Sequence, residues 1–201
     1  QKWRALIRDI RAAYAGPLTY AANWGKRSDG EYYQIDWWDA LDAIGIDAYF
    51  PVATDGNPTA ATIQSAWTST NSGGQQSWLA DIRALHERFN KPVIFTEIGY
   101  LSCDRAGIKP WEYPCKKTVD LSEQATLYEG TLQFWSDKEW MQGFLFWRWD
   151  VDPDKGGVND GDYLVQNKPQ TLKALKKLWS GSVSAISGGS TSGGPEVEPR
   201  P

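Results

Sequence analysis

The stretch KPVIFTEIGY, residues 91–100, runs a series of apolar residues into a single carboxylate, Glu97. Near-continuous apolar runs of this kind are typical of strands that are buried on both faces of a parallel sheet. Because side chains alternate along a strand, we expect Val93 and Phe95 to share a face with Glu97. A buried carboxylate is costly unless it is hydrogen-bonded. The position of Glu97 at the end of a hydrophobic strand therefore suggests a functional role.

Three more strands and several helices are predicted around this stretch. The strand-like runs are LTYAANW (18–24), IDAYFP (46–51) and MQGFLFWRW (141–149). Apolar residues recur at helical spacing before Gly16-Pro17, in WWDALDAI (37–44), over residues 75–89, from Leu121 to Trp135, and from Leu172 to Leu178. Leu121 and Ser122 are interpreted as a hydrophobic residue followed by an N-cap.

The alternation of strands and helices predicts an α/β fold of parallel units with right-handed crossovers. Each unit takes roughly 40 residues, so a closed eightfold barrel would need over about 300 residues. The chain of 201 residues therefore looks like half of a barrel, with its first four units upstream of the opening helix. The alternative is a small open α/β sheet that is complete in itself. Residues 1–180 are predicted to form this domain, and the Ser-, Gly- and Pro-rich residues 181–201 a linker or disordered tail.

Composition and charge favour a carbohydrate ligand over other partners. The chain has 21 Lys and Arg against 25 Asp and Glu, with no basic cluster among aromatics, so nucleic acid is not expected as a partner. No run approaches the roughly 18 apolar residues of a membrane span, so no membrane contact is expected. Twelve Trp and nine Tyr are more than a core of this size needs, and their rings suit the C–H faces of sugars. The alternative is that these rings simply fill the core, which we expect for about half of the tryptophans.

The histidine and cysteine content narrows the chemistry further. With His86 as its single histidine, the chain offers no convincing Ser-His-Asp set, and a zinc site that needs two or three imidazoles cannot be assembled. His86 itself falls in a helical pattern and is expected to be structural, so no metal or cofactor is expected and the chemistry rests on carboxylates. Cys103 and Cys115 are expected to form a disulfide in an oxidising compartment. Two free thiols in a cytosolic protein are the alternative.

Polar and aromatic residues stand at the end of each predicted strand. They are Asn23, Trp24, Asp47, Tyr49, Thr96, Glu97, Trp147 and Trp149. Active sites of parallel barrels are built at the carboxyl ends of the strands. These side chains are therefore expected to converge on one site.

Four segments carry a resemblance to a known family. LTYAANW, IGIDAYFP, KPVIFTEIGY followed by PWE, and GFLFWRWD resemble, in this order, the second half of glycoside hydrolase family 113. Characterised members of that family are β-mannanases with a (β/α)8 TIM barrel of the clan A type. The resemblance covers residues 1 to about 180 and implies that the chain supplies roughly strands 5 to 8 of the barrel.

The resemblance implies a retaining mechanism with Glu97 as nucleophile. Retaining glycosidases use two carboxyl groups about 5 Å apart. In clan A the acid/base glutamate follows an Asn at the end of strand four, which places it upstream of this chain. Glu31, Glu112 and Asp152 fall in predicted loops on the correct side, but no motif places them near Glu97.

The resemblance also implies roles in substrate binding. Tyr49 matches a tyrosine whose phenol would hydrogen-bond the nucleophile, and Trp147 matches a stacking floor for the sugar. Trp149 would extend that floor, and Trp111 of PWE would reach the sugar cleft. The expected substrate-binding residues are Asn23, Trp24, Tyr49, Trp111, Trp147 and Trp149. The alternative is that these are structural residues of the core and strand ends.

The aspartate-rich segment DVDPDKGGVNDGD, residues 150–162, partly matches a calcium-binding loop. Asp150, Asp152 and Asp154 match the first ligand positions of an EF-hand loop, but Lys155 and Gly161 replace its required Gly and Glu. A solvated loop is favoured, with an irregular calcium site as the alternative.

Together these observations predict a secreted or cell-surface retaining endo-glycosidase that hydrolyses β-1,4-linked mannan-type polysaccharide. The alternatives are a non-catalytic carbohydrate-binding protein and another clan A specificity, such as glucanase or xylanase. The full barrel is expected to be a monomer. Half a barrel alone would expose a sheet edge and an apolar face, so we expect it to aggregate, dimerise or depend on the missing half.

Overall fold

The computed structural model describes residues 2–70 and 77–182. Within them, one parallel sheet has the strand order β1-β2-β3-β4. Its strands are β1 (Ala21–Asn23), β2 (Ile44–Asp47), β3 (Val93–Ile98) and β4 (Met141–Phe146). The predicted parallel alternation is confirmed, with each strand beside the next one along the chain.

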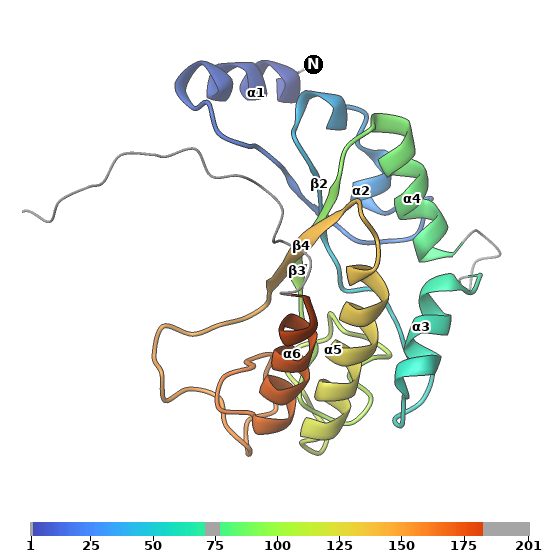
Figure 1. Ribbon diagram of the computed structural model, residues 1–201, viewed down its shortest axis with the longest axis vertical. Coiled ribbons are helices and arrows are strands. Elements are labelled where there is room, and N and C mark those ends of the chain that lie inside the picture. Colours follow the sequence, from blue (N-terminus) through green and yellow to red (C-terminus); the bar gives the residue numbers. More distant parts are fainter. Residues whose placement is uncertain (1, 71–76, 183–201) are drawn as a thin grey trace, which may run out of the picture.

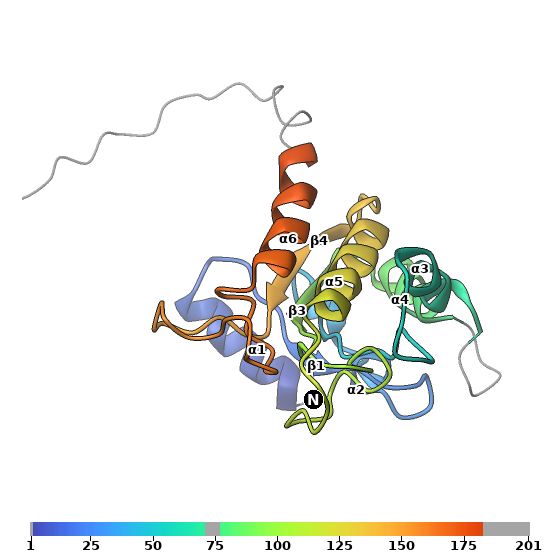
Figure 2. The ribbon, with the colours of Figure 1, turned by 90° about the horizontal axis from the view of Figure 1, so that it is seen from below.

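Helices precede, connect and follow these strands (Figures 1 and 2). They are α1 (Lys2–Ala13), α2 (Glu31–Gln34), the 3-10 helix η1 (Trp38–Ala40), α3 (Ala60–Thr68), α4 (Trp78–Phe89), α5 (Leu121–Ser136) and α6 (Pro169–Ser182). In both views α3, α4 and α5 lie together on the side of the sheet away from α1. None of the helices in the described ranges is long and apolar enough to cross a membrane.

The hydrophobic core fills the space between the sheet and these helices. Phe95 of β3 packs edge-on against Trp135 of α5, with ring centroids 5.1 Å apart, and stacks near Trp67 of α3. Ile44 and Ile46 of β2 are fully buried in the same cluster. Each buried large side chain contributes roughly 1.5–3 kcal/mol to folding, so this layer holds the strands in place.

The opposite face of the sheet is open. In β1, Ala22 is buried while Ala21 and Asn23 are exposed, as alternation along a strand requires. On β4, Leu145 is 54% exposed. In a closed barrel this face points into the barrel interior, where side chains from all the strands fill it. The open face therefore fits a partial barrel.

One register shift changes the expected direction of Glu97. Ile46 pairs with Phe95, but the next residue, Asp47, pairs with Glu97, so Thr96 is an extra residue in β3. Phe95 consequently faces the helices, whereas Glu97 faces the opposite side. The prediction that Val93 and Phe95 share a face with Glu97 was wrong, because a β-bulge breaks the alternation and re-aims the side chain.

Several predicted element bounds also needed correction. Residues 37–44 form only the short helix η1, because Leu41 is already extended and Ile44 begins β2. The N-cap of α5 is Asp120, whose side chain accepts from the Glu123 N–H, and not Ser122.

The remaining differences concern lengths and ranges. The helices α2 and α3 were not predicted, because α2 is one turn long and α3 has a weak apolar pattern between loops. In the segment 75–89 the helix begins at Trp78, and residues 75–76 lie outside the described residues. The predicted tail lies outside them from residue 183 onward.

Candidate active site

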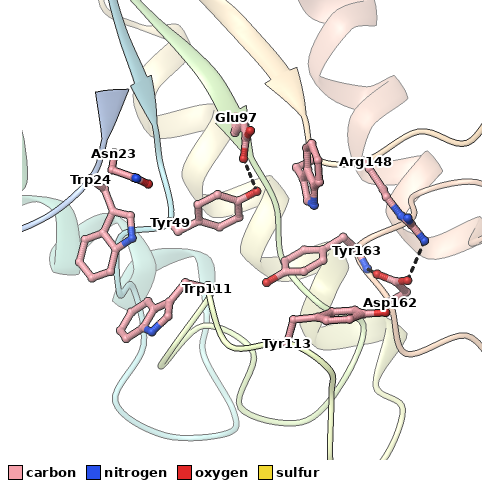
Figure 3. Close-up of a pocket in the computed structure, with 10 residues that line it drawn as sticks. Asn23, Trp24, Tyr49, Glu97, Trp111, Tyr113, Arg148, Asp162 and Tyr163 are labelled. Carbon is pink, nitrogen blue, oxygen red and sulfur yellow. Dashed lines mark hydrogen bonds and ion pairs between the residues drawn. The ribbon is translucent and has the colours of Figure 1, made fainter. Parts of the chain in front are cut away.

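A pocket of about 490 Å³ opens at the carboxyl ends of the strands (Figure 3). Its lining consists of Asn23, Trp24, Tyr49, Glu97, Trp111, Tyr113, Trp147, Arg148, Asp162 and Tyr163. Six of the sequence-predicted site residues are therefore brought together here: Asn23, Trp24, Tyr49, Glu97, Trp111 and Trp147. Trp149 is 62% exposed and is not part of this lining.

Glu97 is held by Tyr49 from the neighbouring strand. The Tyr49 hydroxyl donates a hydrogen bond of 2.8 Å to Oε2 of Glu97. Burial, together with this hydrogen bond to the carboxylate, raises the pKa of Tyr49 above its ordinary value. The phenol therefore stays protonated and remains a donor to Glu97 throughout the neutral range.

A second carboxylate, Asp47, lies on β2 as the direct partner of Glu97 in the register. The Thr96 hydroxyl donates to Oδ1 of Asp47 over 2.8 Å. Burial raises the pKa of Asp47, the Thr96 hydrogen bond opposes that rise, and the nearby charges of Glu97 and Glu31 add to it. Thr96, the extra residue of the bulge, thus hydrogen-bonds Asp47, while the Glu97 carboxylate accepts from Tyr49.

Gly99, two residues after Glu97, stands at a position that has no room for a side chain. A Cβ at this position would lie 2.3 Å from the carbonyl oxygen of Trp147 and 2.9 Å from the ring of Tyr163. Contacts that short require the backbone to shift. The glycine therefore allows β3 to approach the Trp147 backbone and brings two pocket residues close to Glu97.

Aromatic rings line the far side of the pocket. The rings of Trp24 and Trp111 lie 4.6 Å apart between centroids with an interplanar angle of 37°. Tyr113 stacks on Tyr163 at 6.2 Å. Trp147 is 44% exposed, so its ring remains open to a ligand. Flat amphipathic surfaces of this kind suit the apolar faces of sugar rings.

The loop after β3 carries two of these aromatics and is fixed at several points. A disulfide joins Cys103 to Cys115, which confirms the predicted pairing. On α5 the Glu123 carboxylate accepts the backbone N–H groups of Arg105 at 2.8 Å and Gly107 at 3.3 Å. Burial raises the pKa of Glu123, and these two hydrogen bonds oppose the rise. The loop therefore presents Trp111 and Tyr113 from a braced backbone.

Four pocket residues were missed by the sequence reasoning: Tyr113, Arg148, Asp162 and Tyr163. Arg148 pairs with Asp162 at 2.9 Å, and the Tyr163 hydroxyl donates to the Pro110 carbonyl. Burial raises the pKa of Tyr163 to about 12. The available signal for Arg148 was its place between the two tryptophans of WRW, residues 147–149. Only the two tryptophans were predicted as site residues.

The aspartate-rich segment uses its carboxylates locally. Asp150 accepts the N–H of Asp152, and Asp152 accepts that of Asp154, each at 3.0 Å. Asp160 lies 4.0 Å from the ammonium of the buried Lys168. Within residues 2–70 and 77–182, no group of three or more His, Cys, Asp and Glu side chains is placed to hold a metal ion.

The other carboxylates considered as acid catalysts lie outside the pocket lining. Glu31 accepts the Tyr20 hydroxyl at 2.7 Å and the Asn23 N–H at 3.0 Å, and it belongs to α2 rather than to a loop. Glu112 is exposed near Lys109, and Asp152 is exposed. None of the three is positioned beside Glu97 at the pocket.

The chain was compared with known protein families and with curated protein sequences. The family model described as Glycoside Hydrolase Family 113 matches residues 1–168. No curated protein sequence shows a significant match to the chain.

Solved structures that are similar to this chain include members of the same family, glycoside hydrolase family 113. The chain is similar to a family 113 β-mannanase from Alicyclobacillus acidocaldarius, solved in complex with ManMIm. The TM-score is 0.68 and the identity 27%, with 89% of this chain and 50% of that chain covered. A second family 113 β-1,4-mannanase gives a TM-score of 0.66 at 26% identity, with the same coverage of 89% and 50%. The chain thus spans about half the length of the mannanases it matches.

More distant matches concern the fold alone. A β-glucuronidase from Ruminococcus gnavus gives a TM-score of 0.56 at 16% identity, covering 88% of this chain and 29% of that chain. The fold of this chain is therefore shared with that β-glucuronidase.

Proposed function

Because the chain belongs to glycoside hydrolase family 113, we propose that it is the carboxyl-terminal half of the catalytic barrel of a retaining β-1,4-mannanase. In this proposal the chain supplies strands 5 to 8, with residues 1–180 as the half-barrel and 181–201 as a linker. Similarity to two β-mannanases, each about half covered, supports the substrate class.

The observation that carries the proposal is the placement of Glu97. Its carboxylate lies in a pocket rich in aromatics and accepts a hydrogen bond of 2.8 Å from Tyr49. A carboxylate held by a hydrogen-bond donor at the wall of such a pocket is placed to act as a nucleophile. Trp147 offers an exposed ring beside it for the sugar at the cleavage point.

In the proposed reaction, an oxygen of Glu97 attacks the anomeric carbon, and the bond from that carbon to the leaving sugar oxygen breaks. The leaving oxygen takes a proton from a second carboxylic acid about 5 Å from the nucleophile. Water then attacks the anomeric carbon, gives its proton to the same second group, and releases the Glu97 carboxylate. We place this second group upstream of the chain, in the other half of the barrel.

A non-catalytic carbohydrate-binding role is the second candidate for the chain on its own. Among the described residues of the pocket, only Glu97 and Asp162 carry carboxylates, and Asp162 is ion-paired with Arg148. Another clan A specificity, such as glucanase or xylanase, is the alternative within the enzyme class. The substrate panel of the experiment below separates these possibilities.

The proposed location is extracellular or at the cell surface. The disulfide between Cys103 and Cys115 supports an oxidising compartment, since such bonds are rare in the reducing cytosol. A polysaccharide substrate is too large to enter cells, which fits the same location. The proposed full barrel acts as a monomer.

The test is hydrolysis of β-1,4-mannan, cellulose and xylan by the intact gene product and by the 201-residue chain. Each is compared with Glu97→Gln and with Glu112→Gln, an exposed glutamate outside the pocket, as matched control. We expect mannan hydrolysis by the intact protein, loss of about a thousandfold or more in Glu97→Gln, and no loss in Glu112→Gln. Hydrolysis that survives Glu97→Gln would show that another residue is the nucleophile.

A further inference from the structure

Lys168, the residue just before α6, is a fully buried cation outside the pocket lining, and the proposed reaction does not use it. Its ammonium group donates to the Ser102 hydroxyl at 2.6 Å and to the Asp162 carbonyl at 2.8 Å, and it lies 4.0 Å from the Asp160 carboxylate. Burial lowers its pKa to about 8 against the opposing charges of Asp160 and Asp162. The group is therefore cationic in the neutral and mildly acidic range.

Stability alone gives no reason for a charge at this position. Taking an ammonium group out of water is costly, and apolar side chains of similar volume often replace buried ions without loss of stability. A methionine would be about as long as Lys168 and would need no hydrogen-bond partners. What the ammonium group adds is a fixed distance to Ser102 and to Asp162, so its contribution is geometric.

Four residues form a junction that we call the lysine strap: Ser102, Asp160, Asp162 and Lys168. Ser102 is buried in the loop after β3, and its N–H donates to the Asp162 carbonyl at 3.3 Å. Its hydroxyl donates toward the carbonyls of Asp160 and Asp162. The Asp162 N–H in turn donates to Oδ1 of Asp160 at 2.7 Å. The strap therefore ties the loop after β3 to the segment after β4.

The lysine strap reaches the pocket through Asp162 and the next residue, Tyr163 (Figure 3). The Asp162 carboxylate pairs with Arg148 at 2.9 Å and accepts the Tyr163 N–H at 2.6 Å. The Tyr163 ring packs edge-on against Tyr49, the donor to Glu97, with ring centroids 6.1 Å apart. A movement of this segment would therefore displace one wall of the pocket, while Glu97 stays on β3.

We propose that Lys168 is a positioning residue of the pocket: through the lysine strap it fixes Asp162 and Tyr163, and with them the wall beside which the sugar binds. This inference rests on the proposed function and deepens it, because it assigns a role in substrate binding to a residue that does not touch the substrate. The wall carries Arg148 and Tyr163 rather than the nucleophile. Loss of the strap therefore acts on KM more than on kcat.

The test removes the lysine strap from each side without changing a residue of the pocket lining. Lys168→Met removes the ammonium group, and Ser102→Ala removes the hydroxyl that it contacts. Leu175→Ala, at a buried position on α6 outside both the strap and the pocket lining, is the control for lowered stability alone. The intact gene product, the three variants and the double variant Lys168→Met, Ser102→Ala are assayed on mannohexaose at about pH 6.5, where Lys168 is charged. Each assay is run well below the melting temperature of the variant.

We expect KM to rise about tenfold in each strap variant, with kcat within about threefold of the unmodified value. Because both changes act on the same Asp162 carbonyl, the double variant should lose little more than either single variant. Leu175→Ala should melt at a lower temperature and keep both kinetic constants.

Three results would overturn the inference while leaving the proposed hydrolysis intact. They are an unchanged KM in the strap variants, a loss confined to kcat, and the same rise of KM in Leu175→Ala. If Lys168→Met does not fold, Ser102→Ala decides by the same criteria.

Failure of the proposed hydrolysis gives a different pattern. If the unmodified protein does not cleave mannohexaose, titration calorimetry with the same sugar replaces the kinetics. Binding that weakens about tenfold in Lys168→Met and in Ser102→Ala, but not in Leu175→Ala, supports the role of the strap. Binding that the strap variants retain, or absence of binding by the unmodified protein, overturns it.

Discussion

The hydroxyl of Tyr49 donates a hydrogen bond of 2.8 Å to Oε2 of Glu97, which joins the end of β2 to the bulged end of β3. The bond depends on the register shift at Thr96, because without that extra residue Glu97 would face the helices with Phe95. Burial and the bond to Glu97 keep the pKa of Tyr49 high, so the donor proton is retained.

Removal of this donor is the first prediction. Tyr49→Phe keeps the ring and deletes the hydroxyl, so it removes a hydrogen bond to a charged group. Such bonds contribute about 1.5–3 kcal/mol, which corresponds to a loss of roughly ten- to a hundredfold in kcat on mannan. Steady-state kinetics of the intact gene product measure the loss.

The control for this variant is Tyr163→Phe, which also deletes a hydroxyl in the pocket. That hydroxyl donates to the Pro110 carbonyl and not to Glu97. We expect its effect on kcat to be clearly smaller than that of Tyr49→Phe. Equal losses in the two variants would contradict a specific role for the Tyr49 bond.

The disulfide gives a prediction about stability. Cys103 and Cys115 are 12 residues apart, and a loop of about 15 residues closed by a disulfide is worth about 3 kcal/mol in the chain-entropy model. The double variant Cys103→Ser, Cys115→Ser should lower the free energy of unfolding by about 2–3 kcal/mol. Urea unfolding monitored by tryptophan fluorescence measures the change.

A kinetic measurement on the same double variant tests the bracing of Trp111 and Tyr113. We expect KM for mannohexaose to rise more than kcat falls, since the loop carries ring surfaces rather than the nucleophile. A double variant as stable as the unmodified protein would mean that Glu123 holds this loop unaided.

The strands and their parallel order could be predicted because buried strands carry a signal within the chain itself. Apolar runs near residues 93–98 and 141–146 stand out against the helical spacing between them. The strand ends were less accurate, since Tyr49 and Trp147 favour strands by composition yet lie beyond the ladders. Six of the pocket residues could be named from their place after these runs.

The rest of the site depends on contacts that no local pattern encodes. The bulge at Thr96 is a relation between two strands, so it cannot be read from either strand alone. Asp162 belongs to an aspartate-rich segment that resembles a solvated loop, and it reaches the pocket because it pairs with Arg148. The buried Lys168 helps to hold that segment by donating to the Asp162 carbonyl at 2.8 Å.

The open face of the sheet predicts the behaviour of the chain when it is produced alone. Leu145 is 54% exposed on β4, which is an edge strand within the described residues. Exposed edges and apolar faces promote association, so we expect the 201-residue chain to self-associate at micromolar concentration. Sedimentation velocity measures this, and Leu145→Lys should reduce it more than Ser122→Lys on the helical side. A monodisperse monomer with a cooperative melting transition would contradict the half-barrel proposal.

Lys168 gives a prediction about pH. Its side chain is fully buried and donates to the Ser102 hydroxyl at 2.6 Å, and burial lowers its pKa to about 8 against the opposing charges of Asp160 and Asp162. An unfolded lysine has a pKa of about 10.4, so between about pH 8 and 10.4 the unfolded state binds more protons than the folded state. The contribution of Lys168 to the free energy of unfolding therefore rises with pH in this window.

The size of that rise is at most about 3 kcal/mol, since each pKa unit corresponds to about 1.4 kcal/mol. Urea unfolding at half-unit steps from pH 7 to 10.5 should show the unmodified protein gaining stability relative to Lys168→Met. Titrating tyrosines are common to both proteins and cancel in the difference. Lys173→Met, at an exposed position on α6, the helix that follows Lys168, should run parallel to the unmodified protein. A difference that stays flat or shrinks as the pH rises would mean that Lys168 keeps an ordinary pKa in the folded chain.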